Sequence, residues 1–83
     1  MKEINEKIEI MCWQNGIGWS YRTVYSDDTL FMTGKEIKDL KENFSWDWWE
    51  KLDCREGEDL RIKITYSYNG EIIASYETWQ SEL

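Results

Sequence analysis

The chain has 83 residues, which suits one small domain spanning residues 1–83. Its 17 acidic and 10 basic residues give a formal net charge of −7, so phosphate backbones and anionic membrane surfaces would repel it. The composition therefore argues against direct binding to nucleic acids or membranes, and it favours a protein partner with a basic surface.

Residues 8–25 predict a first β-hairpin. Apolar side chains occupy every second position from Ile8 to Cys12, as in a half-buried strand, and Asn15-Gly16 is a typical two-residue hairpin turn. With that turn, Cys12 would lie opposite Trp19. The large side chains of both strands would then share one face of the sheet.

The middle of the chain predicts a helical segment. Thr33 and Glu36 match a capping box, in which each side chain accepts a hydrogen bond from the backbone N–H of the other residue. The apolar stripe that follows at helical spacing consists of Ile37, Leu40 and Phe44. Ser45 then either caps a second short helix over residues 46–53 or marks a kink in one longer helix, and the sequence does not separate these alternatives.

A second hairpin is predicted near the C-terminus, because apolar and polar residues alternate strictly over residues 60–68. A two-residue turn at Asn69-Gly70 would place Ile64 opposite a serine on the core face. A three-residue loop that includes Tyr68 would instead pair Ile64 with Ala74, so we expect this longer loop with a bulge at its glycine.

The order of elements is therefore ββαββ and the expected fold class is α+β. The simplest arrangement is a four-stranded antiparallel sheet made of two hairpins, with the helical segment packed on one face. The order of the strands within the sheet is not determined by the sequence. The 6 Trp, 5 Tyr and 2 Phe residues supply large core side chains to a domain that is too small to bury much surface.

The motifs of enzymes and cofactor sites are missing from the sequence. It has no histidine, the commonest general base and metal ligand, and no C-x-x-C, Walker or G-x-G-x-x-G pattern. The stretch from Asp53 to Asp59 falls short of a calcium loop because Arg55 stands where an oxygen ligand is needed. We therefore expect a non-enzymatic protein with no catalytic residue, no metal and no cofactor.

The sequence also predicts a cytoplasmic location. Residues 1–10 are charged and lack the apolar run of a signal peptide, and no segment approaches the roughly 20 apolar residues of a membrane span. Cys12 and Cys54 are the only cysteines. In a reducing compartment we expect free thiols, although a single disulfide between them is the alternative.

Most of the net charge lies in residues 42–59, where seven acidic residues face two basic ones for a net charge of −5. If residues 46–53 are helical, Trp48 and Trp49 face the core and Trp46 lies among the carboxylates. A tryptophan on an acidic face can anchor a basic protein while the carboxylates steer the encounter. The alternative is an ordinary solvated face with Trp46 in the core. The candidate partner-binding residues are Trp46, Asp47, Glu50, Asp53, Glu56, Glu58 and Asp59.

A second candidate surface is the outer face of the sheet. One helix cannot cover both faces, so apolar residues on the outer face either lie beneath an end of the chain or form a contact with a partner or a second copy. The predicted registers place on this face Met11, Trp13, Val24, Ile73 and Trp79. A homodimer that uses these residues is therefore possible.

In size, acidity and compact α+β layout, the whole chain resembles the small inhibitors that bacteriophages encode against host defences, anti-CRISPR proteins among them. The resemblance covers composition and layout and carries over no functional residues. We expect an inhibitor that mimics nucleic acid, since carboxylates can occupy the phosphate positions of a basic binding site. The alternative is a structural or housekeeping domain that homodimerises through the outer sheet face.

Overall fold

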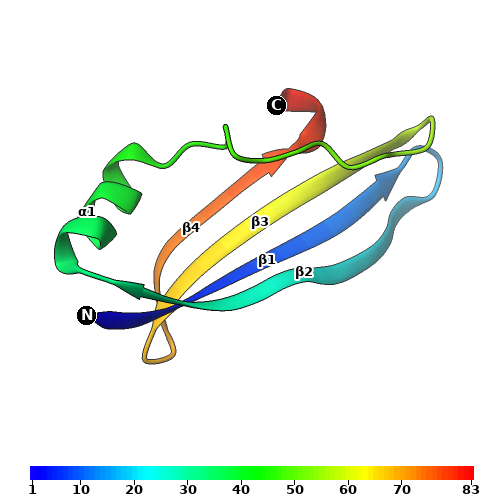
Figure 1. Cartoon of the computed structure of the whole chain (residues 1–83). Helices are drawn as coiled ribbons and strands as arrows, with labels where there is room; N and C mark the ends of the chain where they lie inside the picture. The colour runs from blue at the N-terminus through cyan, green and yellow to red at the C-terminus, as the bar shows by residue number, and fades with distance from the viewer.

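The structure is a computed structural model that describes all 83 residues, and it has an α+β fold with the order ββαββ (Figure 1). The sheet is antiparallel with the strand order β2-β1-β3-β4, so the two hairpins meet through the central strands β1 and β3. The expected fold class is confirmed. The elements are β1 (Lys2–Gln14), β2 (Gly18–Met32), α1 (Gly34–Asn43), β3 (Glu58–Tyr68), β4 (Glu71–Trp79) and the short 3-10 helix η1 (Gln80–Glu82).

Helix α1 begins at the predicted capping box. The Thr33 Oγ1 atom accepts a hydrogen bond from the Glu36 N–H at 3.2 Å, and Glu36 Oε1 accepts one from the Thr33 N–H at 3.1 Å. After α1, residues 44–57 cross the same face of the sheet as a largely extended chain, with one turn at residues 46–49 and another before β3 (Figure 1). We call this segment the strap. Both expected alternatives, a second short helix over residues 46–53 and one longer helix with a kink at Ser45, are therefore wrong.

The length of the sheet explains why an extended strap replaces a helix. The 13 residues of β1 span about 43 Å, whereas the 10 residues of α1 span about 15 Å. An extended chain covers the remaining length with fewer residues than a helix needs. The change begins at Phe44, whose backbone leaves the helical region (φ −58°, ψ 135°), and the Ser45 hydroxyl then accepts a hydrogen bond from the Asp47 N–H at 3.2 Å.

The core is a thin layer between the sheet and its cover. Only 10 of the 83 residues are buried, so stability depends on a few large side chains. The fully buried side chains are Ile4, Cys12, Ile62 and Ile64. The side chains of α1 and the strap that pack over this layer are Ile37, Leu40, Phe44, Trp46, Trp49 and Leu52.

The first hairpin differs from its predicted register. The loop spans residues 15–17 rather than two residues, and Gly16 adopts a left-handed conformation (φ +84°) that favours glycine. As a result Trp13, not Cys12, lies opposite Trp19. Trp19 therefore shares the outer face of the sheet with Trp13, because directly paired residues lie on one face.

The second hairpin also differs, and its difference restores the core face. The turn has two residues, Asn69-Gly70, both in the left-handed region (φ 50° and 79°) as a type I′ turn requires. A bulge at Ile73 then shifts the register, so Ile64 lies opposite Tyr76 rather than Ala74. The bulge turns Ile73 towards the core, where it packs against the main cluster. Its predicted place on the outer face is therefore wrong.

The molecule is flat because its cover lies on one face only. Its Cα atoms extend over 46 × 23 × 15 Å, and the radius of gyration is 14.4 Å, against about 12 Å for a compact domain of this length. Neither α1 nor η1 has the length and apolar character needed to cross a membrane. Cys12 is buried, Cys54 is exposed, and both thiols are free.

Candidate protein-binding surfaces

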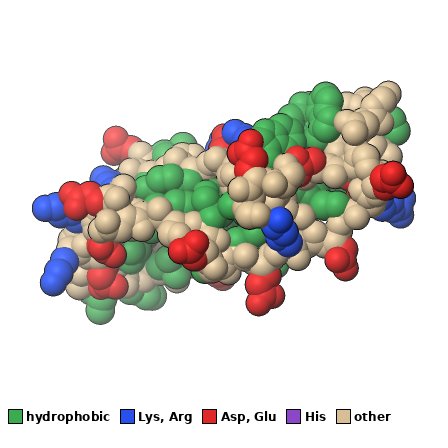
Figure 2. Space-filling view, turned by 90° about the horizontal axis from the view of Figure 1, so that it is seen from above, with side chains coloured by type: hydrophobic (Ala, Val, Ile, Leu, Met, Phe, Trp, Pro, Cys, Tyr) green, Lys and Arg blue, Asp and Glu red, His purple; other side chains and the backbone are tan.

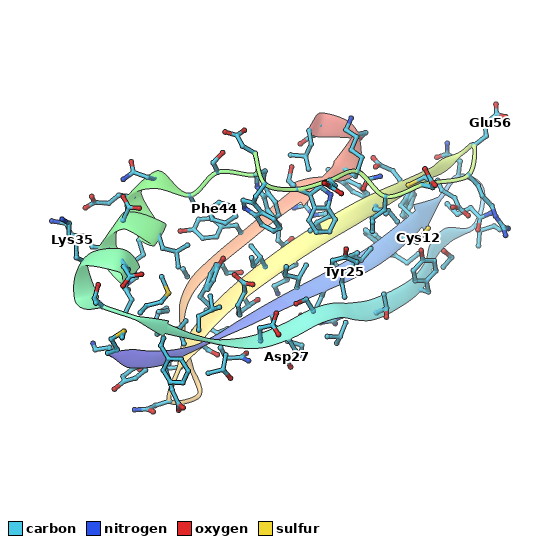
Figure 3. All side chains as sticks on the ribbon, viewed as in Figure 1. Cys12, Tyr25, Asp27, Lys35, Phe44 and Glu56 are labelled. Carbon is cyan, nitrogen blue, oxygen red and sulfur yellow. The ribbon has the colours of Figure 1, made fainter.

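The strap presents a row of carboxylates to solvent. Asp47, Glu50, Asp53 and Glu56 recur at every third residue, and all four side chains are exposed. None takes part in the three ion pairs of the chain. Neighbouring members of the row are at most about 11 Å apart between Cα atoms, the reach of three extended residues. Figure 3 shows Glu56 pointing away from the sheet at the end of the strap.

The last two acidic candidates stabilise the fold instead. The Glu58 carboxylate accepts a hydrogen bond from the Arg55 N–H at 3.2 Å, within the turn that leads into β3. The Asp59 carboxylate accepts hydrogen bonds from the Ser81 N–H at 3.2 Å and the Ser81 hydroxyl at 2.6 Å, which ties η1 to β3. Both side chains are half-buried. They do not extend the exposed row.

The predicted positions of two strap tryptophans are reversed. Trp46 is half-buried and packs on the core, with its ring edge-to-face against Phe44 at 5.1 Å between centroids. Trp48 is 49% exposed and lies against Trp46 at 5.8 Å and Trp49 at 5.7 Å. Helical spacing does not apply here, because a turn closed by the Trp49 N–H and the Trp46 C=O at 2.9 Å redirects the side chains. Trp48 is thus the aromatic side chain beside the carboxylates.

Gln80 fixes the middle of the strap. Its side chain is buried, and its Oε1 atom accepts a hydrogen bond from the Leu52 N–H at 2.8 Å. Its Nε2 atom donates to the Leu52 C=O at 2.7 Å and to Cys54 Sγ at 3.3 Å. The sequence gives no signal for this role, since the two partners are distant in the chain and a glutamine after a strand resembles a surface residue.

The pKa values of Tyr21, Cys54 and Tyr66 are raised, which favours the neutral form of each side chain. Partial desolvation raises the pKa of the Cys54 thiol, although the residue is exposed, and the Asp59 charge acts in the same direction. Partial desolvation also raises the pKa of the half-exposed Tyr21, with a contribution from Cys12. A raised thiol pKa means little thiolate at neutral pH and hence a weak nucleophile.

A cluster of three tryptophans lies at one end of the outer sheet face. Trp13 and Trp19 meet edge-to-face at 5.2 Å, and Trp19 stacks on Trp79 at 5.7 Å with 7° between the rings. The three rings line a hollow of about 380 Å³ whose rim includes Asp59 and Glu82. Large aromatic side chains at a solvent-exposed site are typical anchors of protein contacts. We call this set the tryptophan cluster.

Ion pairs cross the middle of the outer face. Arg22 pairs with Glu9, and Glu77 pairs with Arg61 at 3.1 Å and with Lys63 at 3.8 Å. The face is therefore polar at its centre and aromatic at one end. The predicted outer-face residues that lie on it are Met11, Trp13, Val24 and Trp79. Trp19 belongs with them and was missed by the predicted register.

Comparison of the chain with protein-family models, with curated proteins and with solved structures found no match. No group of three or more His, Cys, Asp or Glu side chains in the chain is arranged to hold a metal ion. The strap and the outer sheet face are the two candidate functional surfaces of the chain.

Proposed function

We propose that the chain is a non-enzymatic, cytoplasmic protein-binding module that inhibits a nucleic-acid-binding protein by occupying its basic site. The observation that carries this proposal is the row of Asp47, Glu50, Asp53 and Glu56, exposed and without ion-pair partners, next to the exposed ring of Trp48. A site that holds phosphates already presents the Lys and Arg side chains that such a row needs.

The fold supports this role by holding the strap in place. Trp46, Trp49 and Leu52 pack on the core beneath it, and Gln80 binds its backbone. Figure 2, seen from above, shows acidic side chains spread around hydrophobic ones on this side of the molecule. A segment that is ordered before binding loses less conformational entropy when the partner arrives. The carboxylates would steer the encounter, and Trp48 would supply apolar contact.

Charge reversal on the strap is expected to abolish partner binding. The variant Asp47→Lys, Glu50→Lys, Asp53→Lys would place like charges against a basic site. Each such contact costs several kcal/mol, so affinity should fall at least about 100-fold. Affinity capture from a bacterial lysate with mass spectrometry would identify the retained protein. The nucleic acid that this retained protein binds should then compete with the chain for the same site, which a fluorescence anisotropy assay measures.

The matched control reverses the same number of charges outside the strap. Glu3, Asp28 and Glu71 are exposed, and replacing all three with lysine gives the same net charge as the strap variant. This control should retain the partner with little loss of affinity. Equal loss in both variants would show a net-charge effect, and a partner that binds nucleic acid and the chain simultaneously would rule out competition.

Self-association through the outer face is a second candidate, favoured by the tryptophan cluster on an uncovered sheet. A face of about 43 × 19 Å offers about 800 Å², which matches the area each partner contributes to a standard interface. This candidate predicts a dimer at micromolar concentration in sedimentation equilibrium. Replacing Trp19 and Trp79 with alanine should then give a monomer. A wild-type chain that stays monomeric to about 1 mM would contradict the candidate.

A further inference from the structure

A hollow of about 430 Å³ lies beside the strap, between the end of α1 and the central strands. Phe44, Ser45 and Trp48 line it from the strap. Glu6 of β1 and Tyr66 of β3 line it from the sheet. The hollow therefore adjoins the row of strap carboxylates and shares its exposed tryptophan.

Two carboxylates give this hollow acceptors for a cation. Glu6 and Asp39 both line it, and no lysine or arginine does. Neither carboxylate belongs to an ion pair of the chain. Glu6 accepts one hydrogen bond, from the Tyr66 hydroxyl at 2.8 Å, and Asp39 accepts one from Asn43 Nδ2 at 2.8 Å. Each carboxylate thus keeps further capacity to accept hydrogen bonds.

The helix dipole adds to the negative potential of the hollow, and the Tyr66 hydroxyl orients one of its carboxylates. The C-terminal end of α1 lies at the hollow through Leu40 and Asn43, and the helix dipole places partial negative charge there. Burial raises the pKa of Tyr66 well above its usual range, and the hydrogen bond to Glu6 adds to the shift. The Tyr66 hydroxyl therefore stays protonated and continues to orient the Glu6 carboxylate.

The ring of Trp48 is positioned to contact the same ligand. It is 49% exposed, yet Trp46 and Trp49 hold it on two sides, at centroid distances of 5.8 and 5.7 Å. A tryptophan face attracts cations, and the attraction grows when water is excluded. The hollow therefore offers a cation two carboxylates and one aromatic ring among its lining residues.

We propose that this hollow receives one arginine side chain of the basic protein partner, an inference that rests on the proposed function. A guanidinium group fits these features better than an ammonium group. It is planar and stacks on aromatic rings, and its fork of N–H donors can bind a carboxylate through two hydrogen bonds. The strap row would meet the surrounding basic residues of the partner, and the hollow would fix the register of the contact.

The test uses an acetylated, amidated hexa-arginine peptide, with hexa-lysine as the comparison, and follows the Trp48 indole N–H by NMR. Hexa-arginine should shift this resonance in a saturable way and bind at least about threefold more tightly than hexa-lysine. The variant Glu6→Gln, Asp39→Asn should weaken hexa-arginine binding at least about fivefold. Both substitutions preserve the side-chain acceptor of the present hydrogen bonds, so the variant should fold.

The control variant Glu3→Gln, Glu71→Gln removes the same charge from exposed positions outside the hollow and should change affinity less than about twofold. Equal weakening in both variants, equal binding of the two peptides, or no Trp48 shift would overturn the arginine site. Asp39→Asn alone, an exposed change on α1, repeats the test if the double variant is unfolded. The strap charge-reversal experiment does not involve the hollow residues, so it decides the proposed function separately.

Discussion

Replacing Gln80 with alanine should lower the free energy of unfolding by about 2–4 kcal/mol and free the middle of the strap. The side chain is 6% exposed and is the hydrogen-bond partner of both the N–H and the C=O of Leu52. Without it, two backbone groups of the strap lose their partners, and each costs about 1–3 kcal/mol if it stays buried. Urea unfolding measures the global loss, and hydrogen exchange at the Leu52 amide measures the local opening.

Gln14→Ala is the matched control, because Gln14 and Gln80 are the only glutamines of the chain and the Gln14 side chain forms no hydrogen bond. It should change stability by less than about 0.5 kcal/mol. Similar losses in the two variants would mean that Gln80 does not fix the strap. If Gln80 does fix the strap, Gln80→Ala should also weaken partner binding. The carboxylate row of the variant would lose conformational entropy on association, which lowers the affinity.

Ile64→Ala should be the most damaging single truncation in the core, with an expected loss of about 3–5 kcal/mol. The side chain is fully buried, between Ile8 on β1 and Tyr76 on β4. A domain of this length has a total stability of about 4–12 kcal/mol, so the change would remove a large share of it. Thermal unfolding followed by circular dichroism should show a midpoint at least about 12 °C lower.

Ile72→Ala provides the comparison, because Ile72 is 64% exposed and loses the same atoms. Its effect should stay below about 0.5 kcal/mol. Ile64→Val, expected to cost about 0.5–1.5 kcal/mol, gives a graded measurement if the alanine variant does not fold. Equal stability of the Ile64→Ala and Ile72→Ala proteins would contradict the described core.

Features that depend on neighbouring residues could be predicted from the sequence. The capping box of Thr33 and Glu36 needs only four consecutive residues, and it forms as predicted. Strict alternation over residues 60–68 likewise places the core side chains of β3 correctly. The capping box is predictable because one short segment contains both its hydrogen-bond donors and its acceptors. The alternation is predictable because one short segment contains a whole face of the strand.

The turns are harder to predict because the turn type that the local residues favour conflicts with the strand register that the core requires. Asn69-Gly70 favours a two-residue turn, and the core needs large side chains on one face. The prediction satisfies the core with a three-residue turn. The structure instead keeps the two-residue turn and adds a bulge at Ile73. The cost of a bulge depends on the partner strands, so residues of one hairpin do not decide between these solutions.

The sequence predicts which residues of the strap are acidic, but it does not predict the backbone conformation of the strap. Its acidic residues were found from charge alone, and Asp47, Glu50, Asp53 and Glu56 are exposed as expected. Their backbone conformation depends on how much of the sheet α1 leaves uncovered, which is a long-range property. Helical spacing therefore predicts Trp48 in the core, whereas the structure exposes its side chain.

The sheet contains three β-bulges, each with one residue that has no cross-strand partner, and all three lie on the edge strands β2 and β4. Tyr25 and Ser20 are the unpaired residues of β2, and Ile73 is that of β4, while β1 and β3 pair without interruption. Bulges twist an edge and interrupt its row of free N–H and C=O groups, which hinders the addition of strands from other molecules. In a flat, aromatic-rich chain with a 15-residue edge strand, these bulges therefore work against fibril growth, and the irregular edges leave the two faces as the surfaces open to the proposed partner.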